Sequence, residues 1–294
     1  MSDVATVTAS ETTTALPRTG GTWRFIRRNP TLFAGLVILS LMALIALIAP
    51  LIAGDPVTMK PADRLKPPSE THWFGTDHLG RDIWARTVYG ARVSLLVGFS
   101  VAAISMAIGL FIGLLAGFSR IVESVVMRLM DGLMAIPAIL LAIAMVSLSK
   151  ASVLIVILAI VIPEVPRVVR LVRAVVLSVR EQPFVEAAVA SGTRLPRILL
   201  RHILPATVPP LIVQATYIAA SAILIEAALS FLGAGTPPEI PTWGNMIATS
   251  RVYLGRAPWT VFCPGLALAL VVLAVNLVGD GLRDRLDPRI ARRM

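Results

Sequence analysis

The chain has 294 residues, of which 56% are hydrophobic and 15% are charged, and its mean hydropathy is +0.81. Soluble domains carry about a quarter charged residues, so this composition excludes an ordinary soluble protein and indicates an integral membrane protein. The formal net charge of +10 does not indicate nucleic acid as a partner, because membrane proteins concentrate Lys and Arg in the connectors on their inner side. The single cysteine, Cys263, leaves no disulfide framework and no cysteine metal site within the chain, and we expect it to pack.

The N-terminal region predicts a tail followed by a membrane anchor. Residues 1–30 are interpreted as a disordered, basic cytoplasmic tail, because they begin with a stretch rich in Ser, Thr, Ala and Gly that lacks periodicity. The uncharged run that follows predicts a first span at about 31–53, which is long enough to cross about 30 Å of hydrocarbon. A signal peptide has a shorter apolar core nearer the N-terminus, so this run is interpreted as a retained anchor with the N-terminus inside.

A polar, proline-rich stretch separates the first span from the second. In it, Thr76 or Asp77 is predicted to cap a helix that begins near Leu79, and the alternating Arg and Asp residues are predicted to pair with one another. His72 and His78 stand six residues apart in the same stretch, which leaves a metal pair open but matches no metalloprotease spacing.

The next spans are predicted at about 94–118, 132–149 and 152–172. In the first of these, Gly109, Gly113 and Gly117 recur every four residues, which favours the close approach of two membrane helices. The second is predicted to kink at Pro137, and Asp131 before it is expected to pair with Arg128. The third is the shortest apolar run of the set, because Pro163, Glu164 and Pro166 interrupt it.

Residues 183–205 predict a polar elbow that is too short to cross a bilayer. Pro183 and Pro196 suit the first turns of two helices, Gly192 suits the turn between them, and Pro205 is predicted to end the second helix. Arginines three and four apart make one face of the second helix cationic and leave another apolar. An ordinary surface connector is the alternative interpretation of this segment.

The last two spans are predicted at about 206–228 and 259–279. Glu226, near the end of the former, is expected to have an interfacial or Arg-paired role, although an acid inside a membrane segment is a candidate functional residue. Trp243, Tyr253 and Trp259 fit an aromatic belt as readily as a substrate wall.

Four stretches of the chain together resemble the permeases of ABC importers, and three of them resemble the second permease of the dipeptide, oligopeptide and nickel branch. The elbow resembles the EAA loop of these permeases, with His202 standing where the general motif has an apolar residue. The resemblance implies that the elbow couples to an ATPase through Glu186, Ala187, Ala188, Gly192, Arg197, Leu204 and Pro205. The polar stretch before the second span matches the branch at Gly75, Thr76, Asp77, Gly80, Arg81 and Asp82. The outer loop from Ser230 to Asn245 also matches, and the terminal signature falls on Asn276, Gly279, Asp280, Arg283, Asp284 and Asp287.

The resemblance implies an all-α polytopic fold with six transmembrane helices, the type I importer permease fold with a cytoplasmic coupling helix. The expected function is to form half of a pathway for peptides or a related small solute, in the bacterial inner membrane with both termini cytoplasmic. The expected partners are a homologous permease, two cytosolic ATPase subunits, an external solute-binding protein and the lipid bilayer. The predicted topology places residues 166–205 in the cytosol. It also places most of the 27 Lys and Arg residues of the chain on the inner side, in agreement with the positive-inside rule.

Energy is expected to come from outside the chain. No Gly-Lys pair occurs, so a Walker-type phosphate loop is absent, and ATP and Mg are expected on the ATPase subunits. No catalytic motif indicates an enzyme. The alternative function is a secondary, ion-coupled transporter, which needs polar residues near the midplane and usually paired internal repeats; neither is evident in the sequence.

Overall fold

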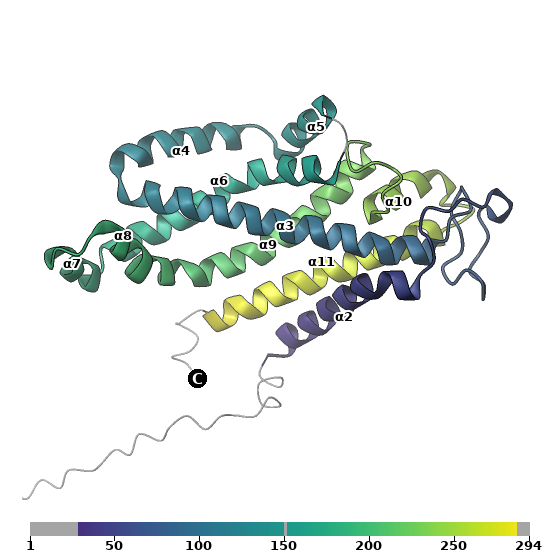
Figure 1. The fold of residues 1–294 in the computed structure, drawn as a ribbon, viewed down its shortest axis with the longest axis horizontal. Helices are drawn as coiled ribbons and strands as arrows, with labels where there is room; N and C mark the ends of the chain where they lie inside the picture. Colours follow the sequence, from purple (N-terminus) through teal and green to yellow (C-terminus); the bar gives the residue numbers. More distant parts are fainter. Residues whose placement is uncertain (1–28, 150–151, 287–294) are drawn as a thin grey trace, which may run out of the picture.

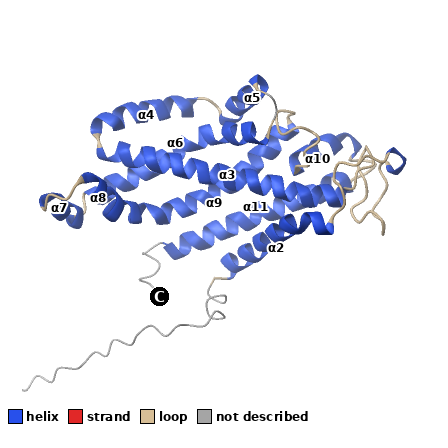
Figure 2. Ribbon diagram, in the orientation of Figure 1, coloured by secondary structure: helices blue, strands red, loops and turns tan. Residues whose placement is uncertain are grey.

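The computed structural model describes residues 29–149 and 152–286, and every regular element in these ranges is helical (Figure 1 and Figure 2). All but the last two residues of the predicted tail lie outside the described residues. The α-helices are α2 (Pro30–Ile52), α3 (Ile83–Phe118), α4 (Arg120–Ala135), α5 (Ala138–Leu148), α6 (Val153–Arg180), α7 (Pro183–Ala190), α8 (Leu195–Ile198), α9 (Leu204–Phe231), α10 (Trp243–Ser250) and α11 (Trp259–Leu286). Short 3-10 turns cover Pro61–Asp63 and Arg251–Tyr253, and a π-helical turn covers Leu199–Ile203.

The centre of the bundle is the contact between α3 and α6, which is the most extensive between any two described helices. A Cβ atom added to Gly113 would lie 2.6 Å from Cβ of Val172, and one added to Gly117 would lie 2.6 Å from Cβ of Val176. Both valines are fully buried. A step of four residues along α3 corresponds to a step of four residues in the same direction along α6, so the two helices run parallel. The predicted close approach at the glycine stripe is confirmed.

Three further long helices complete the bundle. α9 packs on α3, α6 and α11, and α2 packs mainly on α11. Gly281 of α11 lies so close to α2 that an added Cβ would stand 2.5 Å from Cβ of Leu32. This contact places the start of α2 beside the end of α11, as Figure 1 also shows.

The region predicted as the third span forms two helices rather than one kinked helix. α4 and α5 meet at an angle of 83° around Pro137, which has no N–H to continue a helix. α4 turns back along α6, where Glu123 pairs with Arg173 and Asp131 pairs with Arg170. The predicted pairing of Asp131 with Arg128 is therefore wrong, because α4 directs this acid toward the arginines of the neighbouring helix.

By length and composition, four segments of the described chain can cross a membrane: α2, α3, α11 and the continuous helix from Leu195 to Phe231. The bent pair of α4 and α5 raises the number to five. α6 is also long, but Glu164, Arg167 and Arg170 interrupt its apolar part. The six predicted spans are thus not all recovered on these criteria.

The bundle has two different ends (Figure 1). α7 and α8 project from one end, which we call the elbow end. The segment 53–82 and α10 lie at the opposite end, which we call the loop end. α2 begins and α11 finishes toward the elbow end, so the described chain enters and leaves the bundle on the same side.

Candidate functional site

The elbow is a helix, a turn and a second helix, as predicted. α7 ends in a turn where the N–H of Gly192 donates to the carbonyl of Val189 at 2.9 Å and the N–H of Thr193 donates to that of Ala188 at 3.1 Å. These two bonds form a Schellman motif, which needs a left-handed residue between them. Gly192 supplies it with a φ of +72°. The glycine therefore sets the angle at which α8 leaves α7.

Apolar burial fixes the elbow to the bundle. Val185, Ile198 and Ile203 are buried and belong to the same apolar core as residues of the long helices. The ring of His202 stacks on Phe184, with centroids 6.3 Å apart and an interplanar angle of 25°. This contact gives a physical reason for the histidine at a position where the general motif has an apolar residue, and the sequence alone carried no signal for it.

The outer surface of the elbow is both apolar and charged. Glu186 and Ala187 are exposed on α7, and Arg194, Arg197 and Arg201 are exposed on the following segment. Four large apolar side chains of the elbow are also exposed, namely Phe184, Val189, Leu195 and Leu200. Exposed apolar side chains gathered on so short a projection are typical of a protein-binding surface.

The elbow joins α9 without a break, so the predicted helix end at Pro205 is wrong. The N–H of Leu204 donates to the carbonyl of Leu199, five residues earlier, as in a π-helix. Pro205 has no N–H, and its ring would crowd the carbonyl four residues before it in an ordinary α-helix. The wider π-turn relieves this crowding, so the second half of the elbow and α9 form one continuous helix from Leu195 to Phe231.

The family-motif residues of the loop end form a buried network. The Asp77 carboxylate accepts from the N–H of Leu79 at 2.8 Å and from Nε of Arg81 at 2.7 Å. Asp77 and Arg81 are almost fully buried, and Nε of Arg86, also buried, lies 4.0 Å from the same carboxylate. The predicted pairing of Arg with Asp is confirmed here.

The predicted start of the second long helix is about four residues too early, and its predicted cap is the wrong residue. α3 begins at Ile83 rather than near Leu79, and Asp82 caps it by accepting from the N–H of Trp84 at 2.8 Å. Asp77 is unavailable as a cap because its oxygens serve its own turn. Thr76 instead binds across the loop, accepting from the N–H of Lys66 at 2.9 Å.

Two positions next to this network require glycine, because the backbone is left-handed there and a side chain would overlap its neighbours. Gly75 has a φ of +74° and faces Trp259, whose Nε1 would lie 2.7 Å from an added Cβ. Gly80 has a φ of +73°, and an added Cβ would overlap the carbonyl of Lys60. The motif at the loop end is thus explained by folding of the loop itself. His72 lies 3.2 Å from Asp82, and no group of three metal-binding side chains occurs among the described residues.

The terminal signature lies on the last turns of α11. Nδ2 of Asn276 donates to the carbonyl of Val272 at 2.9 Å, and Gly279 is buried against Thr216 of α9. Three charged members are exposed near the elbow end: Asp280, Arg283 and Asp284. The last predicted member, Asp287, lies outside the described residues.

Two buried acids lie within the long helices. Glu226 is fully buried and accepts from the hydroxyl of Ser230 at 2.9 Å, so it is neither interfacial nor paired with an arginine as expected. α10 packs on this part of α9, where an added Cβ at Gly244 would lie 2.6 Å from Cα of Ala227. Glu164 is also buried and pairs with Arg167 at 2.8 Å. Its spacing of three residues from that arginine was visible in the sequence, but its burial was not.

Trp243 fits neither the aromatic belt nor the substrate wall that the sequence suggested. Trp243 is fully buried, and its Nε1 donates to the carbonyl of Thr87 at 3.0 Å. It therefore packs α10 onto α3 and belongs neither to a membrane belt nor to an open substrate wall. Tyr253 stacks on His78 with centroids 5.4 Å apart.

Comparison with protein families places most of the chain in two matched segments. Residues 106–292 match the model of the binding-protein-dependent transport system inner membrane component, and residues 19–68 match the N-terminal TM domain of oligopeptide transport permease C.

Curated relatives match nearly the whole chain. A probable peptide ABC transporter permease protein of Sinorhizobium fredii is 56% identical over 92% of this chain and 93% of its own length. The dipeptide transport system permease protein DppC of Alkalihalophilus pseudofirmus is 44% identical, covering 90% and 88%. The di/tripeptide transport system permease protein of Pseudomonas aeruginosa is 43% identical, covering 91% of each chain.

A solved structure shares the fold. A chain of the MetNI methionine ABC transporter in an inward-facing conformation superposes with a TM-score of 0.57 at 21% identity, covering 70% of this chain and 98% of its own. At this identity the likeness is evidence of the fold alone. None of the comparisons supports an ion-coupled secondary transporter.

Proposed function

Because this chain belongs to the family of binding-protein-dependent transport system inner membrane components, we propose that it forms half of the translocation pathway for short peptides in an ATP-driven importer. The observation that carries the proposal is the elbow, a rigidly joined projection with an exposed apolar and charged surface at one end of a membrane bundle. The relatives named for peptide transport supply the solute class.

The proposed assembly is a heterodimer of this chain with a homologous permease, two cytosolic ATPase subunits and an external solute-binding protein. ATP and Mg bind to the ATPase subunits. The chain lies in the bacterial inner membrane as a multi-pass protein, with its elbow and both termini in the cytosol and its loop end outside. An ATPase docked on the elbow moves a helix that continues into the bundle, because the π-turn joins the elbow to α9 without a flexible break.

The contact with the ATPase is proposed to centre on Glu186, Ala187 and Ala188. Ala187 is exposed and small, so an opposing backbone can approach closely, and the exposed carboxylate of Glu186 offers an acceptor to cationic side chains. Gly192 fixes the direction of the second helix, which presents Arg197. Leu204 and Pro205 belong to the segment that transmits movement into α9.

The test is ATP-dependent peptide uptake by the reconstituted importer carrying Glu186→Gln or Gly192→Ala. Both changes are expected to reduce uptake while the protein still inserts and purifies with its partner permease. Glu181→Gln, an exposed acid just before the elbow, is the matched control and is expected to leave uptake unchanged. Full uptake by both elbow variants would count against the proposal, as would uptake that continues without ATPase subunits.

A further inference from the structure

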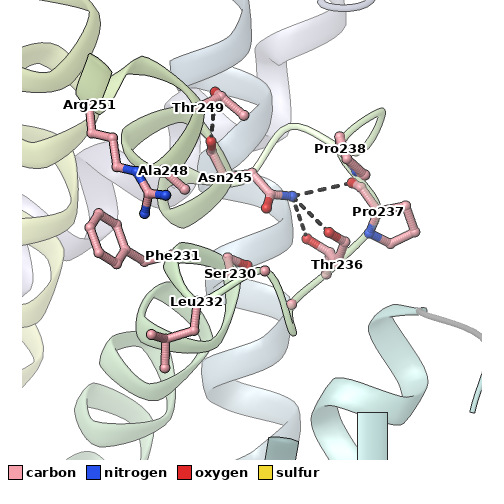
Figure 3. A pocket seen from close by; sticks show the side chains of 12 residues that line it. Ser230, Phe231, Leu232, Thr236, Pro237, Pro238, Asn245, Ala248, Thr249 and Arg251 are labelled. Carbon is pink, nitrogen blue, oxygen red and sulfur yellow. Dashed lines mark hydrogen bonds between the residues drawn. The ribbon is translucent and has the colours of Figure 1, made fainter. Parts of the chain in front are cut away.

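A cleft of about 520 Å³ opens at the loop end, between the last turn of α9, the segment that follows it and α10 (Figure 3). Its volume falls within the range of small-molecule sites. One wall carries Phe231 and Arg251, and the other carries Ser230, Thr236 and Asn245. Most of its lining belongs to the outer loop from Ser230 to Asn245, and the cleft lies apart from the elbow.

The cation of the cleft lacks an acidic partner. The guanidinium of Arg251 lies 5.1 Å from the ring centroid of Phe231, and Arg251 forms no ion pair with any residue in the described ranges. The contact with the ring holds the planar head over an aromatic face. The N–H groups that remain free match the two oxygens of a carboxylate.

The opposite wall is fixed in shape before any ligand arrives. Nδ2 of Asn245, which is buried, donates to the carbonyl of Thr236 at 2.9 Å and to that of Pro237 at 3.2 Å. The hydroxyl of Thr242 accepts from the N–H of Asn245 at 3.2 Å and so caps α10. A preformed wall lowers the entropy cost of binding.

The two walls differ in polarity. Ser230 is buried and gives its hydrogen to Oε1 of Glu226 at 2.9 Å. The hydroxyl therefore offers only lone pairs on its side of the cleft, and an acid lies behind it. An anionic group is attracted to the Arg251 wall and disfavoured at the Ser230 wall.

We propose that this cleft is a binding subsite for a short peptide, whose C-terminal carboxylate pairs with Arg251. The proposal rests on the proposed function for its solute class and for the outward position of the loop end. It adds a binding residue on this chain to the selectivity of the external binding protein. The peptide meets this subsite on its way into the pathway.

The experiment measures protection of a cysteine in the assembled importer without binding protein. Leu232→Cys, on the wall of the cleft, is introduced with Cys263→Ala, and its rate of modification by a maleimide is measured with dialanine or with dialanine amide. Dialanine is expected to slow the modification, and dialanine amide, which lacks the carboxylate, is not. Val252→Cys is exposed and lies outside the cleft, so its modification is expected to be unaffected by either peptide.

Arg251→Gln is expected to raise the dialanine concentration needed for protection by about tenfold or more, because it removes the hydrogen-bonded charge pair with the carboxylate. Arg256→Gln changes the other exposed arginine of this loop and is the matched control. In it, dialanine is expected to protect Leu232→Cys at the same concentration as in the parent. Equal protection by the amide, or full protection in Arg251→Gln, would overturn the proposal. Size-exclusion profiles check that each variant remains assembled.

Uptake assays separate this proposal from the proposed function. ATP-dependent uptake by the parent importer tests the function whatever the protection result. If uptake is normal and dialanine gives no protection, only the subsite fails. If Arg251→Gln raises the binding-protein concentration needed for half-maximal uptake while dialanine gives no protection, the cleft receives the binding protein instead, and the peptide proposal is overturned.

Discussion

At Gly80, both the left-handed backbone and the crowding by neighbouring atoms exclude a side chain. Its φ is +73°, and an added Cβ would overlap the carbonyl of Lys60. Gly233 has a φ of +81° with open space around it, and Gly255 has neither constraint. The three residues therefore separate the cost of a left-handed backbone from the cost of a steric overlap.

We predict that the stability of the purified protein falls in the order Gly255→Ala, Gly233→Ala, Gly80→Ala. The first change is expected to be nearly neutral, and the second to cost about 1 to 2 kcal/mol for the left-handed backbone. Gly80→Ala is expected to cost more, because the loop must also move away from the new methyl group. Thermal unfolding in detergent measures the order, and equal melting temperatures for Gly233→Ala and Gly80→Ala would contradict it.

His78 makes the loop end sensitive to pH. Burial lowers the pKa of its imidazole below the ordinary value, and the nearby charge of Arg81 acts in the same direction, while Asp77 opposes it. The unfolded chain therefore binds a proton here more readily than the folded chain does. This histidine's contribution to stability is present above a pH of about 6.5 and is lost as the pH falls below it.

We predict that hydrogen exchange in residues 61–82 speeds up as the pH is lowered from about 7.5 to about 5.5, after correction for intrinsic exchange rates. His78→Phe preserves a ring to stack on Tyr253 but cannot be protonated, so it is expected to reduce this dependence. Asp55 and Asp63 do not interfere, because hydrogen bonds from Thr58 and Lys66 lower the pKa of their carboxylates. An unchanged pH dependence in His78→Phe would show that another group is responsible.

The same loop shows what local sequence reasoning can and cannot give at single residues. The spacing of Asp77 and Arg81 was enough to predict their pairing, because both lie in one turn. The cap of α3 was misplaced, since both Asp77 and Asp82 suit that role by type. Only the folded loop shows that Asp77 accepts from its own turn and leaves Asp82 to cap the helix.

At the scale of helices, the interface of α3 and α6 depends on residues without side chains. An added Cβ at Gly113 would stand 2.6 Å from Cβ of Val172 and 3.0 Å from the carbonyl of Val169. Gly113→Ala is therefore predicted to force the helices apart, at a cost of about 1 to 3 kcal/mol. The measurement is the melting temperature of the purified protein.

Val172→Ala tests whether the cost arises at this contact. It removes Cγ1 of Val172, which would lie 2.9 Å from the added Cβ, and keeps only the contact with Cβ. The double variant is therefore predicted to be less destabilised than the sum of the two single variants. Gly132→Ala in α4 is the control, because no atom lies within 4 Å of its added Cβ and alanine favours a helix by about 1 kcal/mol. Strict additivity of the two interface changes would contradict the packing argument.

The glycine spacing predicted this interface because the signal repeats along one helix. The course of α4 was not predictable in the same way. Its acids Glu123 and Asp131 pair with arginines that stand 50 and 39 residues later in the chain, and no local pattern identifies such partners. The sequence alone favours the arginine nearest in the chain, Arg128, as the partner of Asp131. Long-range ion pairs and the direction of a helix after a sharp bend thus depend on tertiary packing that the sequence does not state.

At the scale of the whole molecule, the two recognisable regions lie at opposite ends of the bundle. The elbow lies at one end, and the segment 53–82 and α10, which borders the proposed peptide subsite, lie at the other (Figure 1). The sequence predicted this separation because it alternates apolar runs with polar connectors. The helix from Leu195 to Phe231 joins the two ends, so movement at the elbow reaches the wall of the cleft through one continuous element.

This separation predicts opposite labelling of two matched cysteines in intact cells. Val189 at the elbow and Val252 at the loop end are 55% and 73% exposed, so each can be replaced by cysteine in a Cys263→Ala background with little loss of packing. A maleimide that cannot cross the membrane is expected to modify Val252→Cys in whole cells. Val189→Cys is expected to react only after the cells are permeabilised, because the positive-inside rule and ATPase docking both require the elbow to face the cytosol. Modification of Val189→Cys in sealed cells would place the elbow outside, where no ATPase could reach it, and the coupling role would have to be abandoned.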